Sequence, residues 1–306
     1  MMELSLVIPL YNEEGLVDEL VRRSVAAMSS LTDDFEILFV DDGSRDGTLS
    51  RLLELRSAEP RIKVVELSRN FGHQAAFTAG LTFASGRFVA MMDGDLQDPP
   101  EVIGEMYAKI TSGGFDVVYG KRINKTGKAG GKWAKLLFHK SFKRISGFPD
   151  IENVGNFSLL NRSALEALLK FSESTRYLPG LRRFIGFRQD YVMYARDERF
   201  SGKSKMRFPA LLALSSDAIF SFSRLPIRLC LFLGLGGVIV FFLAGLYTLV
   251  AKIAGFAIIG WSSTLLSIYF LGSIQLTFLG ILGEYVFRIY RESQRRPLFL
   301  VRQLYV

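Results

Sequence analysis

The chain has 306 residues and a formal net charge of +8, with 38 lysines and arginines against 30 aspartates and glutamates. This length allows one sizeable domain plus additional segments. A single cysteine, Cys230, excludes both a disulfide framework and a cysteine-based zinc site. The positive charge is compatible with nucleic acid, anionic lipid or a phosphate-bearing substrate. Two long apolar segments near the C-terminus favour the last two partners over nucleic acid.

Strand and helix signals alternate through the first hundred residues. Apolar runs at 4–9, 36–40, 62–67 and 88–92 predict buried strands, and helices are expected over 11–29, from 46 onward and over 72–84. Further strands are expected at 116–120, 157–161 and 190–195. The alternation in the first hundred residues predicts a parallel, doubly wound sheet, within an α/β domain over residues 1–204. Ligands in such sheets bind at the carboxyl ends of the strands.

Two uncharged segments are long enough to cross a bilayer, which takes about 20 apolar residues. The first is Leu229–Ala251. The second uncharged run is Ile253–Gly283, and the span there is expected to use Ser262–Phe287. They predict a transmembrane hairpin over 229–287. An amphipathic interfacial segment is expected at 205–228 before it, and a basic tail at 288–306 after it.

Lysine and arginine flank the hairpin on its outer sides, and Lys252 stands alone between the spans. This bias predicts a multi-pass protein of the inner (cytoplasmic) membrane with both termini and the α/β domain in the cytoplasm. The N-terminus has no signal-peptide pattern. Glycines in both spans would allow close helix packing, including assembly of copies into a homo-oligomer.

Acidic residues follow several of the predicted strands. Asp93 and Asp95 flank Gly94 after the strand at 88–92, and two such carboxylates can bind one divalent cation, with Gln97 as a further oxygen ligand. Asp41 and Asp42 end another strand, where a carboxylate can accept hydrogen bonds from a ribose or a base. Pro9, Tyr11 and Glu13 end the first strand. The histidines, His73 and His139, have no metal-ligand partner at suitable spacing, and we interpret them as structural or surface residues.

In order and spacing, these motifs resemble the family 2 glycosyltransferases with a GT-A fold. The similarity extends over almost the whole chain and is close to the polyprenyl-phosphate sugar transferases, such as dolichol-phosphate mannose synthase and the bactoprenol glucosyltransferases. The motifs that carry it are Val7–Glu14, Val40–Thr48, Ser68–His73, Met92–Glu101, Gly120–Arg122, Arg196 to Lys205, Phe220–Arg228 and Leu282–Tyr285.

The resemblance implies a nucleotide-sugar site, a Mg²⁺ or Mn²⁺ cofactor and a polyprenyl phosphate acceptor. It implies donor binding by Pro9, Tyr11, Glu13, Asp41, Asp42 and Asp93, and metal binding by Asp93, Asp95 and Gln97. It assigns Arg122, Arg199 and Lys205 to phosphate groups, and catalysis to Asp93, Asp95, Arg122 and Asn156. The bactoprenol subgroup usually reads Val-Gly-Asp-Phe where this chain has Val154–Phe157, so an uncharged Asn156 replaces a carboxylate.

The expected reaction is inverting transfer of glucose from UDP-glucose to undecaprenyl phosphate. Two alternatives stay open: a catalytically impaired nucleotide-sugar-binding membrane protein, suggested by Asn156, and a transferase with another donor, such as GDP-mannose or UDP-aminoarabinose. A processive polysaccharide synthase or a translocase would need more spans than the two predicted here, and a translocase would also need ionisable residues inside them.

Overall fold

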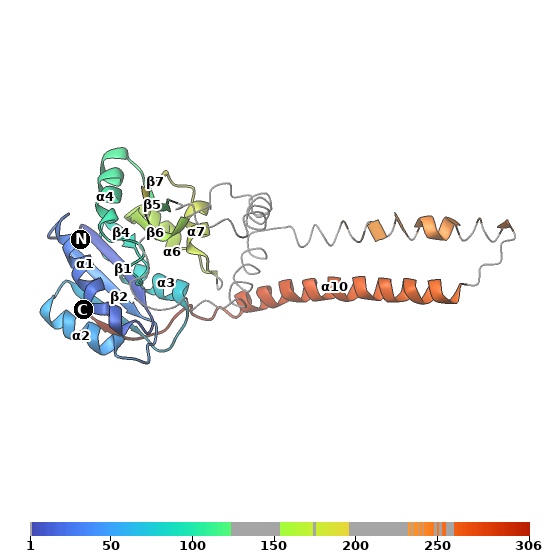
Figure 1. The fold of residues 1–306 in the computed structure, drawn as a ribbon, viewed down its shortest axis with the longest axis horizontal. Helices are drawn as coiled ribbons and strands as arrows, with labels where there is room; N and C mark the ends of the chain where they lie inside the picture. The colour runs from blue at the N-terminus through green and yellow to red at the C-terminus, as the bar shows by residue number, and fades with distance from the viewer. Residues whose placement is uncertain are drawn as a thin grey trace. The chain divides into compact units, whose positions relative to one another are not determined.

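The computed structural model describes residues 2–123, 154–173, 176–195 and 260–306, with scattered positions between 232 and 254. These residues belong to two compact units. The first contains residues 2–123, 154–173 and 176–195 together with Pro297–Val306. The second contains the described positions between 232 and Arg296 (Figure 1).

The first unit is built on one eight-stranded sheet with the order β7-β5-β6-β4-β1-β2-β3-β8. The predicted strands are present, with ends that differ by up to three residues. Their bounds are β1 Leu4–Leu10, β2 Phe35–Asp41, β3 Ile62–Leu67, β4 Phe88–Met91, β5 Val117–Arg122, β6 Val154–Asn161, β7 Gln189–Tyr194 and β8 Val301–Tyr305.

Helices pack on both faces of this sheet. The helices are η1 Glu14–Leu16, α1 Val17–Ser29, α2 Thr48–Ala58, α3 His73–Phe83, α4 Val102–Gly113, α6 Arg162–Leu169 and α7 Leu178–Phe184. Buried residues of α1, α2 and α4 share one hydrophobic cluster, and those of α3, α6 and α7 share the other. Successive residues of a strand point to opposite faces, so the central strands β1 and β2 contribute to both clusters and are buried along their whole length.

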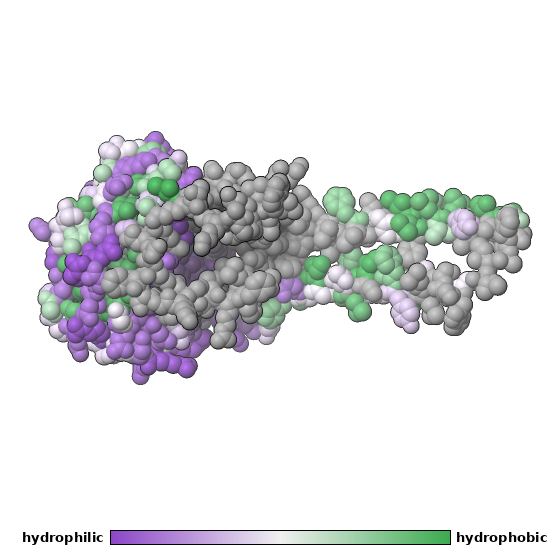
Figure 2. Space-filling model, in the orientation of Figure 1, coloured by the Kyte–Doolittle hydropathy of each residue, from purple (hydrophilic) through white to green (hydrophobic). Residues whose placement is uncertain are grey.

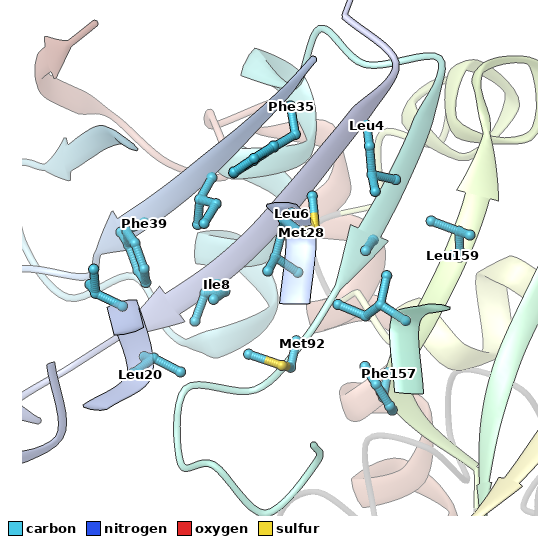
Figure 3. Packing of buried hydrophobic residues seen from close by; sticks show 14 of the residues in the cluster. Leu4, Leu6, Ile8, Leu20, Met28, Phe35, Phe39, Met92, Phe157 and Leu159 are labelled. Carbon is cyan, nitrogen blue, oxygen red and sulfur yellow. The ribbon is translucent and has the colours of Figure 1, made fainter. Parts of the chain in front are cut away.

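Strand β1 shows this alternation. Leu4, Leu6 and Ile8 point into the cluster on the α1 side, where Leu20 and Met28 meet them (Figure 3). Val7 points into the opposite cluster. The continuous apolar runs that predicted buried strands therefore fill two cores at once.

The predictions of an α/β domain and of parallel pairing among the strands of the first hundred residues are confirmed, but the complete sheet is mixed. Strands β1 to β5 and β7 run in one direction, whereas β6 is antiparallel to β4 and β5, and β8 is antiparallel to β3. Both reversed strands enter the sheet from its carboxyl edge. Local hydrophobic pattern specifies that a segment is a strand but not the direction in which it pairs, so the directions of β6 and β8 were not predictable from it.

The C-terminal segment also differs from the prediction of a basic tail over 288–306. Its last residues form β8, which pairs with β3 from Val301 opposite Leu67 to Tyr305 opposite Val64. The Ser68 main-chain N–H also donates to the carbonyl of Leu300, at 2.9 Å. The end of the chain is thus an edge strand of the first unit's sheet.

In the second unit, helix α10 spans Trp261–Ser293. Among the described residues, it holds the one segment, Ser267–Ser293, that is long and apolar enough to cross a bilayer. Large apolar side chains along it are exposed, including Leu276, Leu279 and Leu282, and hydrophobic residues gather on this unit in Figure 2. The predicted segment 205–228 lies outside the described residues, and the first predicted span, 229–251, is described only at scattered positions.

A buried carboxylate joins the strands at the centre of the sheet. Glu36 in β2 accepts hydrogen bonds from Ser5 of β1 at 2.6 Å and from the main-chain N–H of Ser85 at 2.6 Å, and its other oxygen lies 2.5 Å from Lys63 Nζ of β3. Burial alone would raise the pKa of Glu36, but these partners outweigh it and lower the pKa.

We therefore expect Glu36→Gln to lower the free energy of unfolding by about 2 kcal/mol at pH 7, because a buried charged hydrogen-bond acceptor is lost. The folded-state pKa lies below the unfolded value of about 4.3, so this stabilisation is present above that pH and disappears as the pH falls through the folded pKa. Denaturant unfolding at pH 7 and pH 4 measures both effects. Glu19→Gln, at an exposed pair with Arg22, is the control that should leave the unfolding midpoint unchanged.

Candidate active site

The carboxyl ends of β1, β2 and β4 meet at one edge of the sheet. The main-chain N–H of Asp42 donates to the carbonyl of Leu10 at 2.9 Å, and that of Met92 to Val7 at 3.1 Å. Gly94 lies so close to the end of β1 that an added Cβ would be 2.9 Å from the Pro9 carbonyl oxygen. Glycine at this position lets the segment Asp93–Asp95 pass directly over β1.

Asp41, the last residue of β2, and Asp42, the next residue, have different environments. The Asp42 carboxylate accepts main-chain N–H groups of Phe71 and Gly72 at 2.7 and 2.9 Å, so both of its oxygens hold the segment before α3. Asp41 accepts one N–H, from Ser44 at 3.2 Å, and its buried Oδ1 has no hydrogen-bond partner among the described residues. Burial raises the pKa of both carboxyls.

The segment after β1 is tied to the one after β2. Asn12 adopts a left-handed conformation with φ of 54°. Its side-chain oxygen accepts the Arg45 N–H at 2.8 Å, and its own N–H donates to Ser44 Oγ at 3.0 Å. The Glu13 N–H donates to Thr48 Oγ1 at 2.9 Å. These bonds place Tyr11, which is 36% exposed, on the same edge as Asp41.

Asp93 lies at the centre of a polar cluster. Its Oδ1 is 3.3 Å from His73 Nε2 and accepts a hydrogen bond from Asn156 Nδ2 at 3.4 Å. Burial would raise the pKa of Asp93, but His73, Asn156 and the charge of Arg122 outweigh it and lower the pKa. For His73, burial alone would lower the pKa, because it disfavours the charged imidazolium. The carboxylates of Asp93, Asp42 and Asp95 outweigh burial and raise the pKa of His73 overall.

Strand register explains why Asn156 meets Asp93. In the β4–β6 ladder, Phe88 lies opposite Asn161 and Met91 opposite Ser158. Extending that antiparallel register by two residues beyond Met91 places residue 93 opposite residue 156. The reversed direction of β6 therefore brings its first residues to the carboxyl edge, beside the acidic segment.

The cation that the resemblance implies can be tested against these side chains. The described part of the chain has no group of three or more His, Cys, Asp and Glu residues placed to hold a metal ion. Asp93 and Asp95 nevertheless supply hard carboxylate oxygens from one short segment, and Mg²⁺ commonly binds through one or two carboxylates together with substrate phosphates and waters. Asp95 Oδ1 accepts the main-chain N–H of Gln97 at 3.2 Å. These carboxylate oxygens fit a cation site that the phosphate groups of a bound nucleotide would complete.

A second cluster surrounds Arg122. Its Nε donates to the hydroxyl of Tyr194 at 3.2 Å, and its Nη2 lies 3.4 Å from Oδ2 of the fully buried Asp98. The Tyr194 hydroxyl in turn donates to Asp98. An added Cβ at Gly155 would lie 2.9 Å from Arg122 Nη2, so glycine there leaves room for the guanidinium beside the start of β6.

The structure thus brings together most of the residues singled out from sequence, and it adds others. Arg199, Lys205 and His139 lie outside the described residues. The interpretation of His73 as a structural or surface residue misses its contact with Asp93; the signal was its place in the Ser68–His73 motif. The sequence assigned no role to Gln74, Asp98, Arg182 or Tyr194, although Asp98 lies in the Met92–Glu101 motif, because their contacts come from long-range pairing.

Comparison with known proteins identifies the family. Residues 5–169 match the model described as glycosyl transferase family 2. An uncharacterised glycosyltransferase of Synechocystis sp. is 38% identical over 99% of this chain and 96% of its own length. The bactoprenol glucosyl transferase of Shigella phage SfV is 36% identical over 98% of both chains. The chain belongs to glycosyl transferase family 2.

Solved structures give a more distant similarity. Glucosyl-3-phosphoglycerate synthase from Mycobacterium tuberculosis, crystallised with Mn²⁺, uridine diphosphate and glucosyl-3-phosphoglycerate, is 18% identical, with a TM-score of 0.48 over 72% of this chain and 78% of that one. A mannosyltransferase from Pyrobaculum calidifontis in complex with GDP-mannose and Mn²⁺ is 19% identical, with a TM-score of 0.45 over 65% of this chain and 58% of that one.

We expect Tyr194→Phe to lower the free energy of unfolding by about 1–3 kcal/mol, because the buried Asp98 carboxylate loses a hydrogen-bond donor while the ring still packs on Phe157. Tyr191→Phe, on the same strand with a half-exposed ring, is the matched control and should have little effect. Denaturant unfolding of the two variants side by side measures the difference. Equal stabilities would show that the Tyr194 hydroxyl does not support Asp98.

Proposed function

We propose that this protein transfers a hexose from a nucleotide-sugar donor to a polyprenyl phosphate at a membrane surface. The observation that carries the proposal is the pair Asp93 and Asp95 at the carboxyl edge of the sheet, with Arg122 close enough to help lower the pKa of Asp93. Membership of glycosyl transferase family 2 supports sugar transfer. Full-length similarity to proteins named bactoprenol glucosyl transferases supports the lipid phosphate acceptor.

On this proposal, Tyr11 and Asp41 recognise the nucleoside. The buried Asp41 Oδ1, which lacks a partner among the described residues, is suited to accept a hydrogen bond from a ribose hydroxyl or a base N–H. Asp42 instead holds the main chain before α3, so its part is indirect. Pro9 and Glu13 line the same edge. The resemblance to bactoprenol glucosyltransferases favours UDP-glucose as the donor, with GDP-mannose and UDP-aminoarabinose as alternatives.

Asp93 and Asp95 would hold Mg²⁺ or Mn²⁺, which supplies charge stabilisation for the departing diphosphate. Arg122 adds a cation that Asp98 and Tyr194 hold in place, and Gln97 lies beside Asp95. Arg199 and Lys205 are proposed to bind phosphate as well. An acceptor phosphate is ionised near neutral pH, so the attacking oxygen needs no general base.

The proposed reaction is a direct displacement at the anomeric carbon. A bond forms between that carbon and an acceptor phosphate oxygen, while the bond to the diphosphate oxygen breaks and the nucleoside diphosphate leaves with its electron pair. This inverts the configuration of the sugar. An amide at position 156 is compatible with this chemistry, because the acceptor has no proton to lose.

We also propose that the protein is an integral membrane protein with two spans, with the catalytic domain and both termini on the cytoplasmic side. The exposed apolar side chains of α10 support one span, since the helix is not covered by the rest of the described chain. The charge distribution around both apolar segments supports the orientation. Membrane lipids are then partners of the protein, and the glycines in the spans would allow a homo-oligomer.

The test is transfer of radiolabelled sugar from a panel of UDP- and GDP-sugars into undecaprenyl phosphate, with Mg²⁺, Mn²⁺ or a chelator. We expect a lipid-extractable product from one donor that is lost with the chelator. Asp95→Ala should lower turnover on the order of a thousandfold, because charge stabilisation by a metal contributes several kcal/mol. Asp33→Ala, on an exposed turn, is the control and should keep full turnover.

Wild-type turnover in Asp95→Ala would overturn the metal assignment. The impaired-enzyme alternative makes a different prediction: no product from the wild type but turnover in Asn156→Asp. No product from either protein, with any donor, would contradict the proposed reaction.

A further inference from the structure

A chain of hydrogen bonds runs from the first turn of α7 to Asp93. The Leu178 main-chain N–H donates to Gln74 Oε1 at 2.9 Å. Gln74 Nε2 donates to Asn156 Oδ1 at 3.3 Å, and Asn156 Nδ2 donates to Asp93 Oδ1 at 3.4 Å. A main-chain N–H can only donate, so it fixes which end of the Gln74 amide faces Asn156, and thereby which end of the Asn156 amide faces Asp93.

The main chain around Asn156 is held by a buried cation. Arg182 of α7 is 3% exposed and donates to the carbonyl oxygens of Gly155 and Asn156 at 3.1 and 3.3 Å, and to Ser158 Oγ at 2.7 Å. No carboxylate pairs with it among the described residues. Burial lowers its pKa to about 10, so it stays charged at neutral pH. Burying a cation this way is costly, and its hydrogen bonds all go to the first residues of β6.

These contacts converge on one residue, Asn156. Gln74 fixes the side-chain amide of Asn156, and Arg182 fixes the main-chain carbonyl of the same residue. Within the described part of the chain, the hydrogen bonds of Gln74 and Arg182 reach Asp93 only through Asn156. Hydrogen bonds to a metal-binding carboxylate typically set its orientation and strengthen metal binding 10- to 100-fold.

We propose that Gln74 and Arg182 are positioning residues that hold Asn156 as a neutral hydrogen-bond donor to Asp93, so that Asp93 keeps the orientation in which it binds the divalent cation. The inference rests on the proposed function, because it takes Asp93 as a cation ligand. In this inference, Asn156 is a hydrogen-bond donor that adds no charge to the site, and it does not act as a catalytic carboxylate would.

The decisive variant is Gln74→Glu in the full-length protein. The introduced carboxylate still accepts the Leu178 N–H, but its other oxygen cannot donate to Asn156 Oδ1. The Asn156 amide must turn over to donate to that carboxylate, which places its own oxygen against Asp93. We expect Mn²⁺ affinity in the presence of UDP, measured by electron paramagnetic resonance, to fall about tenfold. Thr82→Glu adds the same charge at an exposed position on the same helix and should leave the affinity unchanged.

Arg182→Met tests the main-chain contacts, and Arg183→Met is its matched control for the loss of one charge in α7. We expect weaker Mn²⁺ binding in Arg182→Met and unchanged Mn²⁺ binding in Arg183→Met. If Arg182→Met fails to fold, the Gln74→Glu result decides alone.

A double-variant cycle separates positioning from a general structural effect. In an Asn156→Leu background, Gln74→Glu should cause no further loss of Mn²⁺ affinity, because its effect acts through Asn156. Unchanged affinity in Gln74→Glu, or an equal loss with and without Asn156, would overturn the inference while leaving the proposed function intact. A wild type that binds no Mn²⁺ with either UDP or GDP would overturn both.

Discussion

The site depends on the antiparallel pairing of β6 with β4. If β6 ran parallel to its neighbours, Asn156 would lie near the amino edge of the sheet and away from Asp93. The observed register instead continues from Met91 opposite Ser158 to place residue 156 across from residue 93. The same reversal delivers Gly155 to Arg122, since an added Cβ at this glycine would meet the guanidinium. One strand direction therefore assembles both polar clusters.

Charge balance at this edge follows from burial. Asp41 and Asp42 are almost fully buried, and desolvation raises the pKa of both, whereas Asp93 is kept ionised by neighbouring donors and cations. A site that receives a diphosphate and a second phosphate must offset several negative charges at once. A divalent cation between the carboxylates and the donor would do this, while Arg122 supplies further positive charge near Asp93. The buried Arg182 adds another cation behind the start of β6.

The parts of the fold that sequence predicted are those encoded locally. Apolar runs such as Leu4–Pro9 marked the buried strands, and carboxylates at strand ends marked the edge where ligands were expected to bind. Strand direction, β8 and the roles of Gln74 and Arg182 were not predictable in this way, because each depends on pairing between segments far apart in the chain. Gln74 meets Leu178 across 104 residues, and Tyr305 meets Glu66 across 239. A basic, partly polar segment such as Val301–Tyr305 has no local feature that distinguishes an edge strand from a tail.

The amide at position 156 is accommodated by the polarity of its surroundings. Gln74 presents an N–H to Asn156 Oδ1, and either an amide or a carboxylate could accept it. The difference lies on the other side, where Asn156 donates to Asp93. A carboxylate there would face Asp93 with like charge, a contact that a cation would have to offset, whereas the amide is complementary to Asp93 before any cation binds. Since transfer to a phosphate acceptor needs no general base, the amide removes no group that the proposed reaction requires. Asn156 is therefore consistent with an active transferase whose site carries one negative charge fewer.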